Sequence, residues 1–215
     1  MPGTAALRLL LAIGATASLA GGCGNTARPS DPATAAVTPS APKREPRLKG
    51  EGDELLGTPA PSWNASSWLN SPPLTLEGLR GRVVLLRWWT APDCPLCSGT
   101  APSLNALHAR YKDDGLVVIG FYHHKSNAPL RLSDVADYAS KFGFTFPVAV
   151  DPGWSTLRTY WLDGKERDYT SVSFLLDRRG IIRFIHPGGI YTPGSEAYEE
   201  LRQAIEKAIA EPAGG

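Results

Sequence analysis

The sequence has few cysteines, little net charge and no long hydrophobic run. Three Cys among 215 residues are too few for a small domain held together by disulfides. A formal net charge of +1, with no strongly basic segment, disfavours nucleic-acid binding. The shares of 42% hydrophobic and 20% charged residues are typical of a soluble globular chain. They exclude a multi-span membrane protein and a fully disordered one, and the length suffices for one ordinary domain with additional segments.

The first 22 residues have the composition of an export signal. They contain one base, Arg8, and no acidic residue, and residues 9–20 are all apolar or small. About 12 residues are too few to span a bilayer, but they fit the apolar region of a secretory signal peptide. The run ends in Ala20-Gly21-Gly22-Cys23, which resembles the lipobox of bacterial lipoproteins. The resemblance implies a lipid anchor on Cys23; the alternative is ordinary signal cleavage that leaves Cys23 as a stray thiol.

Residues 23–54 are predicted to form a disordered tether. Pro, Ala, Ser and Thr dominate this segment and no apolar periodicity is present, so it cannot bury enough surface to fold. Its charges balance, which favours a plain spacer over an arm that binds lipid headgroups. A Pro-rich chain extends about 3.1 Å per residue, so the spacer would hold the domain tens of ångströms from a membrane. The remainder, residues 55–212, is predicted to be one domain.

In that domain, strand and helix patterns alternate. Runs of apolar residues predict strands at residues 83–89, 116–122 and 146–150, and a hairpin of residues 172–176 and 181–185. Helical spacing predicts helices at residues 98–111, 134–142 and 196–210, with Ser133 and Ser195 as N-caps of the last two. A short helix at residues 154–161 would place Trp154 and Trp161 on one core-facing side. This order predicts an α/β fold with a central mixed sheet flanked by helices.

The motif Cys94-Pro95-Leu96-Cys97 follows the first predicted strand and precedes a helix. A thiol attacks a disulfide as its thiolate, which the partial positive charge of a helix N-terminus favours. A second cysteine one turn later lies within reach to displace the mixed disulfide. The motif therefore predicts Cys94 as the nucleophile and Cys97 as the resolving thiol, with no cofactor besides their own disulfide. Export would place this pair in an oxidising compartment.

From about residue 57 to 210 the chain resembles the thioredoxin-like redoxins, most closely the membrane-tethered TlpA-type thiol-disulfide oxidoreductases. The resemblance rests on residues 79–89, 91–97, 146–151 and 174–177, and on Pro102, which matches the family's helix-kinking proline. It implies a thioredoxin-like fold with an N-terminal extension and a central insert. It also implies an extracytoplasmic monomer, anchored by lipid, that exchanges electrons with protein thiols or disulfides and with a membrane donor or acceptor.

Three positions depart from the family's pattern. Ser171 stands where the family has a cis-proline, so the Thr170–Ser171 bond is expected to be trans, and these two residues are candidates for the substrate loop. Arg87 stands where thioredoxins carry a buried acid. Near the sulfurs it would stabilise a thiolate and make the oxidised form the better oxidant; alternatively, it extends to water. Asp93, in place of a common Trp, would oppose thiolate formation. The candidate redox-tuning residues are Arg87, Asp93, Pro95 and Trp89.

Three other functions are compatible with the sequence. The cysteines could hold a metal, most seriously copper with one histidine, as in copper-delivery proteins of the Sco type; the available histidines are His108, His123, His124 and His186. A thiol-dependent peroxidase or antioxidant protein is the second, although peroxiredoxins place Thr or Ser where Ala91 stands, and without that hydroxyl a peroxide has one partner fewer. The third is a binding module with idle thiols and a contact surface formed by the six Trp.

Overall fold

The computed structural model describes residues 50–65, 67–167 and 169–212. The predicted signal peptide, the lipidation candidate Cys23 and the tether up to residue 49 lie outside the described residues. Within the described ranges, no helix has both the length and the apolar character needed to cross a membrane.

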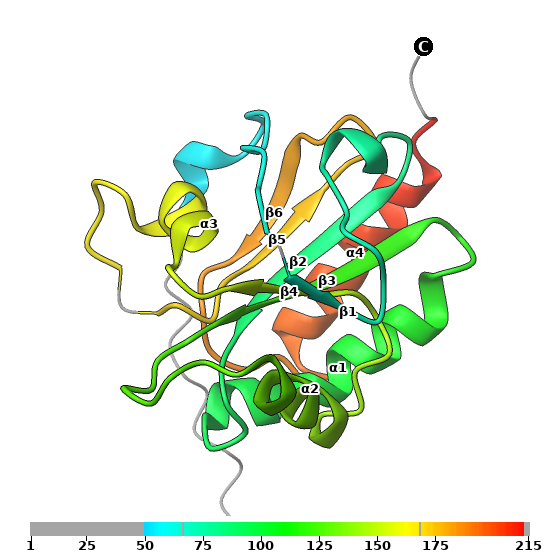
Figure 1. The fold of residues 1–215 in the computed structure, drawn as a ribbon. Coiled ribbons are helices and arrows are strands. Elements are labelled where there is room, and N and C mark those ends of the chain that lie inside the picture. Colours follow the sequence, from blue (N-terminus) through cyan, green and yellow to red (C-terminus); the bar gives the residue numbers. More distant parts are fainter. Residues whose placement is uncertain (1–49, 66, 168, 213–215) are drawn as a thin grey trace, which may run out of the picture. The chain divides into compact units, whose positions relative to one another are not determined.

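Six strands form one mixed sheet in the order β1-β4-β3-β2-β5-β6 (Figure 1). Parallel pairing joins β2 (Val83–Trp89) to β3 (Leu116–His123), and β3 to β4 (Val148–Asp151). At one edge, β1 (Ser67–Leu69) runs antiparallel to β4. On the other side of β2, the antiparallel strands β5 (Ser173–Leu176) and β6 (Ile182–His186) complete the sheet. The predicted mixed sheet is confirmed, with its first predicted strand near the centre.

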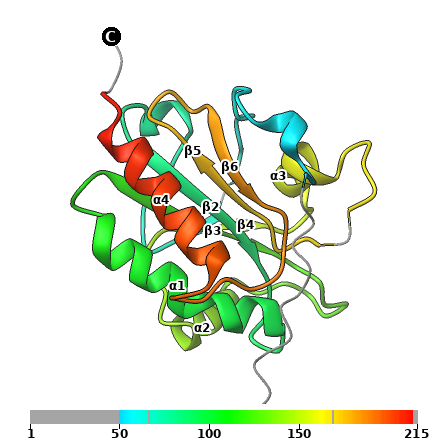
Figure 2. The same ribbon diagram turned by 180° about the vertical axis from the view of Figure 1, so that it is seen from behind.

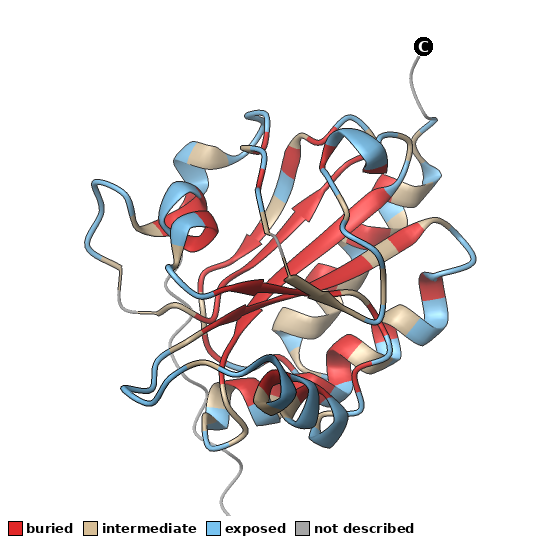
Figure 3. Ribbon diagram, in the orientation of Figure 1, coloured by how far each residue is buried: buried red, intermediate tan, exposed pale blue. Residues whose placement is uncertain are grey.

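Helical layers cover both faces of this sheet. One face packs against α1 (Pro95–Tyr111), α2 (Leu132–Lys141) and α4 (Glu196–Ala210), and Figure 2 shows α1 and α4 in front of the strands. The opposite face packs against the N-terminal segment with η2 (Glu77–Leu79), and against the insert with α3 (Ser155–Leu157) and the π-helical η3 (Arg158–Leu162). Figure 3 shows the strands buried between these layers. The predicted N-terminal extension and central insert are therefore both present.

Every residue of β2 is buried because the strand contributes to both layers of core. Successive side chains of a strand point to opposite faces. Leu85 and Trp89 pack beneath α1, α2 and α4, whereas Leu86 and Trp88 belong to the cluster on the other face. By the same alternation Arg87 points to the α1 face, between Leu85 and Trp89. A polar side chain in a strand buried on both faces must find its partners inside the protein.

Two helices begin earlier than the sequence predicts. α1 begins at Pro95 rather than residue 98, because a proline at the first helical position loses no intrahelical hydrogen bond. α2 begins at Leu132 with Arg131 at the N-cap, so the prediction of Ser133 as a cap was wrong and Ser133 lies inside the first turn. For α4 the prediction is confirmed, because the Ser195 hydroxyl accepts a hydrogen bond from the backbone N–H of Tyr198 at 3.2 Å.

The insert differs from the predicted short helix. Trp154 has a left-handed backbone with φ of 61° and precedes α3, so it shares no helical face with Trp161. Its indole N–H donates to the carbonyl of His124 at 2.8 Å, whereas the Trp161 ring packs against Phe174. The strand predicted at residues 146–150 is β4 at Val148–Asp151. Phe146 precedes that strand, and its carbonyl accepts a hydrogen bond from the side chain of Asn70 instead.

Residues 50–54, assigned above to the tether, are folded against the domain. They lead into the short helix η1 (Asp53–Leu55). The Glu54 carboxylate accepts a hydrogen bond from the Arg167 guanidinium at 2.7 Å, and Arg167 lies over the Trp161 ring at 4.1 Å. At Gly52, a Cβ atom would come within 2.8 Å of Trp161, so only glycine allows the chain to pass so close. The folded part of the chain thus includes residues 50–54.

Candidate active site

The two candidate cysteines lie where β2 gives way to α1. Cys94 is the N-cap of α1 and is half-buried, whereas Cys97, in the first turn, is 3% exposed. Both thiols are free, and their side chains lie close enough for Cys94 to act on the pKa of Cys97. A disulfide substrate can therefore reach Cys94 first, while Cys97 stands directly behind it. This is the order of access that a nucleophile and a resolving thiol require.

The loop before the helix is closed by backbone hydrogen bonds. The Cys94 N–H donates to the Ala91 carbonyl at 3.1 Å, and the Cys94 carbonyl accepts from the N–H groups of Cys97 and Ser98, both at 3.0 Å. Pro95, the first helical residue, is exposed beside Cys94. The cysteine pair therefore sits at the N-terminus of a helix, where the helix dipole favours negative charge.

Cys97 is held as a neutral thiol. Burial raises the pKa of Cys97 to about 12, and the hydrogen bond with Cys94 acts in the same direction. Two groups oppose that rise: the Arg87 cation, and the backbone N–H of Thr90, which donates to the Cys97 sulfur at 3.4 Å. Cys97 therefore carries its proton at neutral pH, and its sulfur would have to lose that proton before it could attack a disulfide.

Arg87 lies under the first turn of α1 and is 1% exposed, so the alternative in which it extends to water was wrong. One terminal nitrogen donates to the carbonyls of Leu96 at 3.4 Å and Gly189 at 3.0 Å, and to the Thr100 hydroxyl at 3.3 Å. The other donates to the Ser173 hydroxyl at 3.3 Å. Leu96 stands between the two cysteines, so Arg87 holds the active-site turn from below.

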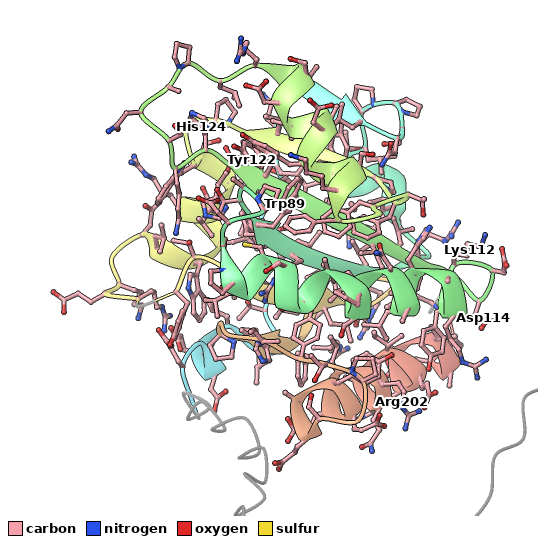
Figure 4. All side chains as sticks on the ribbon, turned by 90° about the horizontal axis from the view of Figure 1, so that it is seen from below. Trp89, Lys112, Asp114, Tyr122, His124 and Arg202 are labelled. Carbon is pink, nitrogen blue, oxygen red and sulfur yellow. The ribbon has the colours of Figure 1, made fainter. Side chains whose placement is uncertain are left out.

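The other two tuning candidates occupy different environments. Trp89 is 1% exposed and packs edge-on against Tyr122 and Phe144, with ring centroids 5.1 and 5.2 Å away. Figure 4 shows Trp89 and Tyr122 toward the end at which α1 begins, with Lys112 beyond its other end. Asp93, by contrast, is exposed. Trp89 is therefore part of the core near the site. Asp93 is a surface residue that precedes Cys94 in the chain.

The candidate substrate loop reaches the same end of the sheet. Ser173 pairs with Arg87, and the Trp88 N–H donates to the Val172 carbonyl at 3.1 Å. Because β5 runs antiparallel to β2, the preceding residues Thr170 and Ser171 lie beside the C-terminal end of β2. No peptide bond in the described ranges is cis, so Thr170–Ser171 is trans, as expected. Ser171 is 4% exposed and its buried hydroxyl has no hydrogen-bond partner.

His123, one of the histidines available for the metal alternative, lies behind this loop. His123 ends β3, is 1% exposed, and its Nε2 lies 3.0 Å from the Thr170 hydroxyl. Burial, and to a smaller degree the Lys125 and Arg87 cations, lower the pKa of His123 to about 3. Its ring stands edge-on to Trp154 at 5.2 Å. A neutral, packed histidine thus holds Thr170 in place.

The metal alternative finds no ligand set in the described part of the chain. No group of three or more His, Cys, Asp or Glu is arranged there to hold a metal ion. While His123 contacts Thr170, His124 lies between the Tyr122 hydroxyl at 3.1 Å and the Ala128 carbonyl at 2.7 Å. The alternative of a contact surface formed by the six tryptophans finds little support in their burial. Trp63, Trp88, Trp89 and Trp161 are buried in the core, and Trp68 and Trp154 are half-buried.

Fold and site together define a thioredoxin-like protein with a cysteine pair at the start of its first long helix. A solved thiol-disulfide isomerase from Corynebacterium glutamicum has the same fold, with a TM-score of 0.56 and 27% identity, covering 71% of this chain and 97% of that one. More particularly, residues 56–185 match the AhpC/TSA family, and the chain belongs to that family.

Two curated relatives are similar over part of the chain. Protein DipZ of Mycobacterium tuberculosis is 33% identical over 138 residues, which is 63% of this chain and 19% of DipZ. Thiol-disulfide oxidoreductase ResA of Bacillus anthracis is 26% identical over 125 residues, which is 58% of this chain and 65% of ResA. The matched region thus spans less than two thirds of either relative.

Proposed function

We propose that this protein is a thiol-disulfide oxidoreductase that exchanges two electrons with protein dithiols or disulfides through Cys94-Pro95-Leu96-Cys97. One observation carries the proposal: half-buried Cys94 occupies the N-cap position of α1, and buried Cys97 lies close to it in the first turn. Relatives whose names are thiol-disulfide oxidoreductase and thiol-disulfide isomerase support it. The pair needs no further cofactor, because the change between its dithiol and its disulfide already transfers two electrons.

The reaction proceeds by two sulfur displacements. The Cys94 thiolate attacks one sulfur of a substrate disulfide, which forms a mixed disulfide and releases the first substrate thiolate. Cys97 then loses its proton and attacks the Cys94 sulfur. The Cys94–Cys97 disulfide forms, the bond from Cys94 to the substrate breaks, and the second substrate thiolate leaves. Two electrons have passed from the pair to the substrate, and a partner dithiol restores the pair by the reverse steps.

Turnover of a protein disulfide tests this proposal. The full chain should accelerate the reduction of insulin disulfides by dithiothreitol, and Cys94→Ser should abolish the acceleration. In protein prepared without the lipid, Cys23→Ser is the matched control, because it also removes one thiol from the same chain but leaves the pair intact. Equal rates for Cys94→Ser and the unaltered protein would refute the proposal.

A second part of the proposal concerns location: the protein is extracytoplasmic and anchored by lipid on Cys23, with a spacer before residue 50. Support comes from the apolar run at residues 9–20 and from the motif Ala20-Gly21-Gly22-Cys23. A membrane anchor would hold the cysteine pair near a membrane electron donor or acceptor. Labelled palmitate should appear in the unaltered protein and be absent from Cys23→Ala. A soluble, unlabelled product cleaved at another site would refute the anchor.

A further inference from the structure

Arg87 is a buried cation without an anionic partner in the described part of the chain. Its four hydrogen bonds run to the hydroxyls of Ser173 and Thr100 and to the carbonyls of Leu96 and Gly189. Its Nε atom is buried and has no partner at all. An arginine does not lose its proton in a protein, so the charge stays. Burial of a charge is unfavourable unless an opposite charge compensates it, and this site supplies only dipoles.

The acidic groups whose charges act on Arg87 are Tyr191, Cys97 and Cys94. Tyr191 offers its ring, 5.4 Å from the guanidinium carbon, but burial raises the pKa of its hydroxyl, so it stays neutral. The two cysteines are therefore the groups left to provide an anion. The guanidinium also donates to the Leu96 carbonyl, which places it beneath the turn that joins them.

Among the described residues, no carboxylate is a group whose charge acts on Arg87. His123 lies on the next strand and feels the Arg87 charge, and the His186 ring stands edge-on to Tyr191 at 5.0 Å. Tyr198 on α4 acts on Tyr191. Histidines and tyrosines do not supply a negative charge at neutral pH.

We propose that the thiolate of Cys97 is the counter-ion of Arg87, so that the arginine is a positioning residue for the second displacement of the reaction. The proposal rests on the proposed oxidoreductase function and assigns a role within it. Cys97 gives its proton to solvent, and Arg87 holds the resulting charge until the sulfur attacks Cys94. The new disulfide forms as the substrate thiolate departs with the electron pair of the broken bond. Arg87 accepts no proton in this step.

The proposal also predicts which redox state the arginine favours. In the disulfide form neither cysteine carries charge, so Arg87 is uncompensated. In the resting dithiol form Cys97 keeps its proton at neutral pH, and the thiolate whose charge acts on Arg87 is that of Cys94. Arg87 therefore stabilises the reduced pair and makes the disulfide a stronger oxidant. A neutral residue at position 87 would shift the balance toward the disulfide.

The two displacements can be separated with 5,5′-dithiobis(2-nitrobenzoate), an aromatic disulfide. With Cys23 replaced by Ser in every protein compared, the reduced chain releases one coloured thiolate when Cys94 attacks, and a second when Cys97 displaces the mixed disulfide. An opposite charge nearby shifts a thiol's ionisation by about one unit or more. In Arg87→Met we therefore expect the second release to slow about tenfold at pH 7, and its pH–rate profile to move to higher pH. Arg87→Lys should restore part of the rate.

Arg178→Met is the matched control. It removes a guanidinium that donates to the carbonyls of Gly81 and Ile209, beyond the end of β2 opposite the cysteines, and should leave both releases unchanged. The reduction potential of Arg87→Met should be lower by about 30 mV, the equivalent of a tenfold change in equilibrium constant. If Arg87 had only a structural role, Arg87→Met would lower the unfolding free energy of the oxidised and the reduced protein by the same amount. The proposal predicts that Arg87→Met shifts stability toward the oxidised form.

An unchanged second release and an unchanged pH profile in folded Arg87→Met would overturn the proposal. If Arg87→Met does not fold, Arg87→Gln gives the same comparison, because it keeps a polar side chain at this position without the charge. A failure of the proposed oxidoreductase function would give a different result from a failure of the role proposed for Arg87. In that case the unaltered protein would show no second release, whatever residue stands at position 87.

Discussion

Protonation of buried His123 should make the protein less stable in mild acid. Burial, followed by the Lys125 and Arg87 cations, lowers the pKa of His123 from 6.5 to about 3 in the folded protein. Between these values the unfolded chain binds a proton that the folded protein does not. The contribution to stability is therefore complete above pH 6.5 and is lost as the pH falls toward 3. Between pH 7 and pH 5 the loss amounts to about 2 kcal/mol of unfolding free energy.

Urea denaturation followed by tryptophan fluorescence, at pH 7 and at pH 5, measures this loss. The unaltered protein should lose about 2 kcal/mol more than His123→Gln over that interval. Other groups that respond to acid, such as His108, whose pKa burial also lowers, are present in both proteins and cancel in the difference. If both proteins lose the same free energy, His123 is not the neutral, buried group described here.

Further substitutions test the packing around the site and the helix ends. Ser195→Ala should lower the unfolding free energy by about 1 kcal/mol, because it removes the α4 cap, whereas Ser133→Ala should change it by less than about 0.5 kcal/mol; equal losses in urea denaturation would refute the assigned caps. Gly188→Ala would place a Cβ 2.3 Å from Tyr169 on a backbone with φ of 155°, so its loss should exceed that of Gly57→Ala by about 1–3 kcal/mol. At Gly57 φ is 80° but the space is open, and a loss as large as that of Gly188→Ala would contradict the close packing on Tyr169.

Much of the fold follows from local sequence patterns. The apolar run that became β2 has no polar face, and such runs are typical of strands covered on both sides. The hairpin of β5 and β6 follows from two apolar runs around the turn at residues 177–180. The cysteine motif lies between a predicted strand and a predicted helix, and this position predicts the candidate site.

What the sequence could not predict depends on contacts between distant residues. Arg87 had two possible directions, and only partners such as Gly189, 102 residues away, decide between them. His123 and Thr170 are 47 residues apart, so their hydrogen bond leaves no mark in either local pattern. The left-handed Trp154 is likewise held by its hydrogen bond to the His124 carbonyl, which helical spacing does not reveal.

The most direct test of the central claim is to trap the mixed disulfide. Cys97→Ser, incubated with a protein that contains a disulfide, should accumulate a covalent adduct because the second displacement cannot occur. Peptide mapping by mass spectrometry should place that adduct on Cys94. No adduct, or an adduct only on Cys23, would contradict the account.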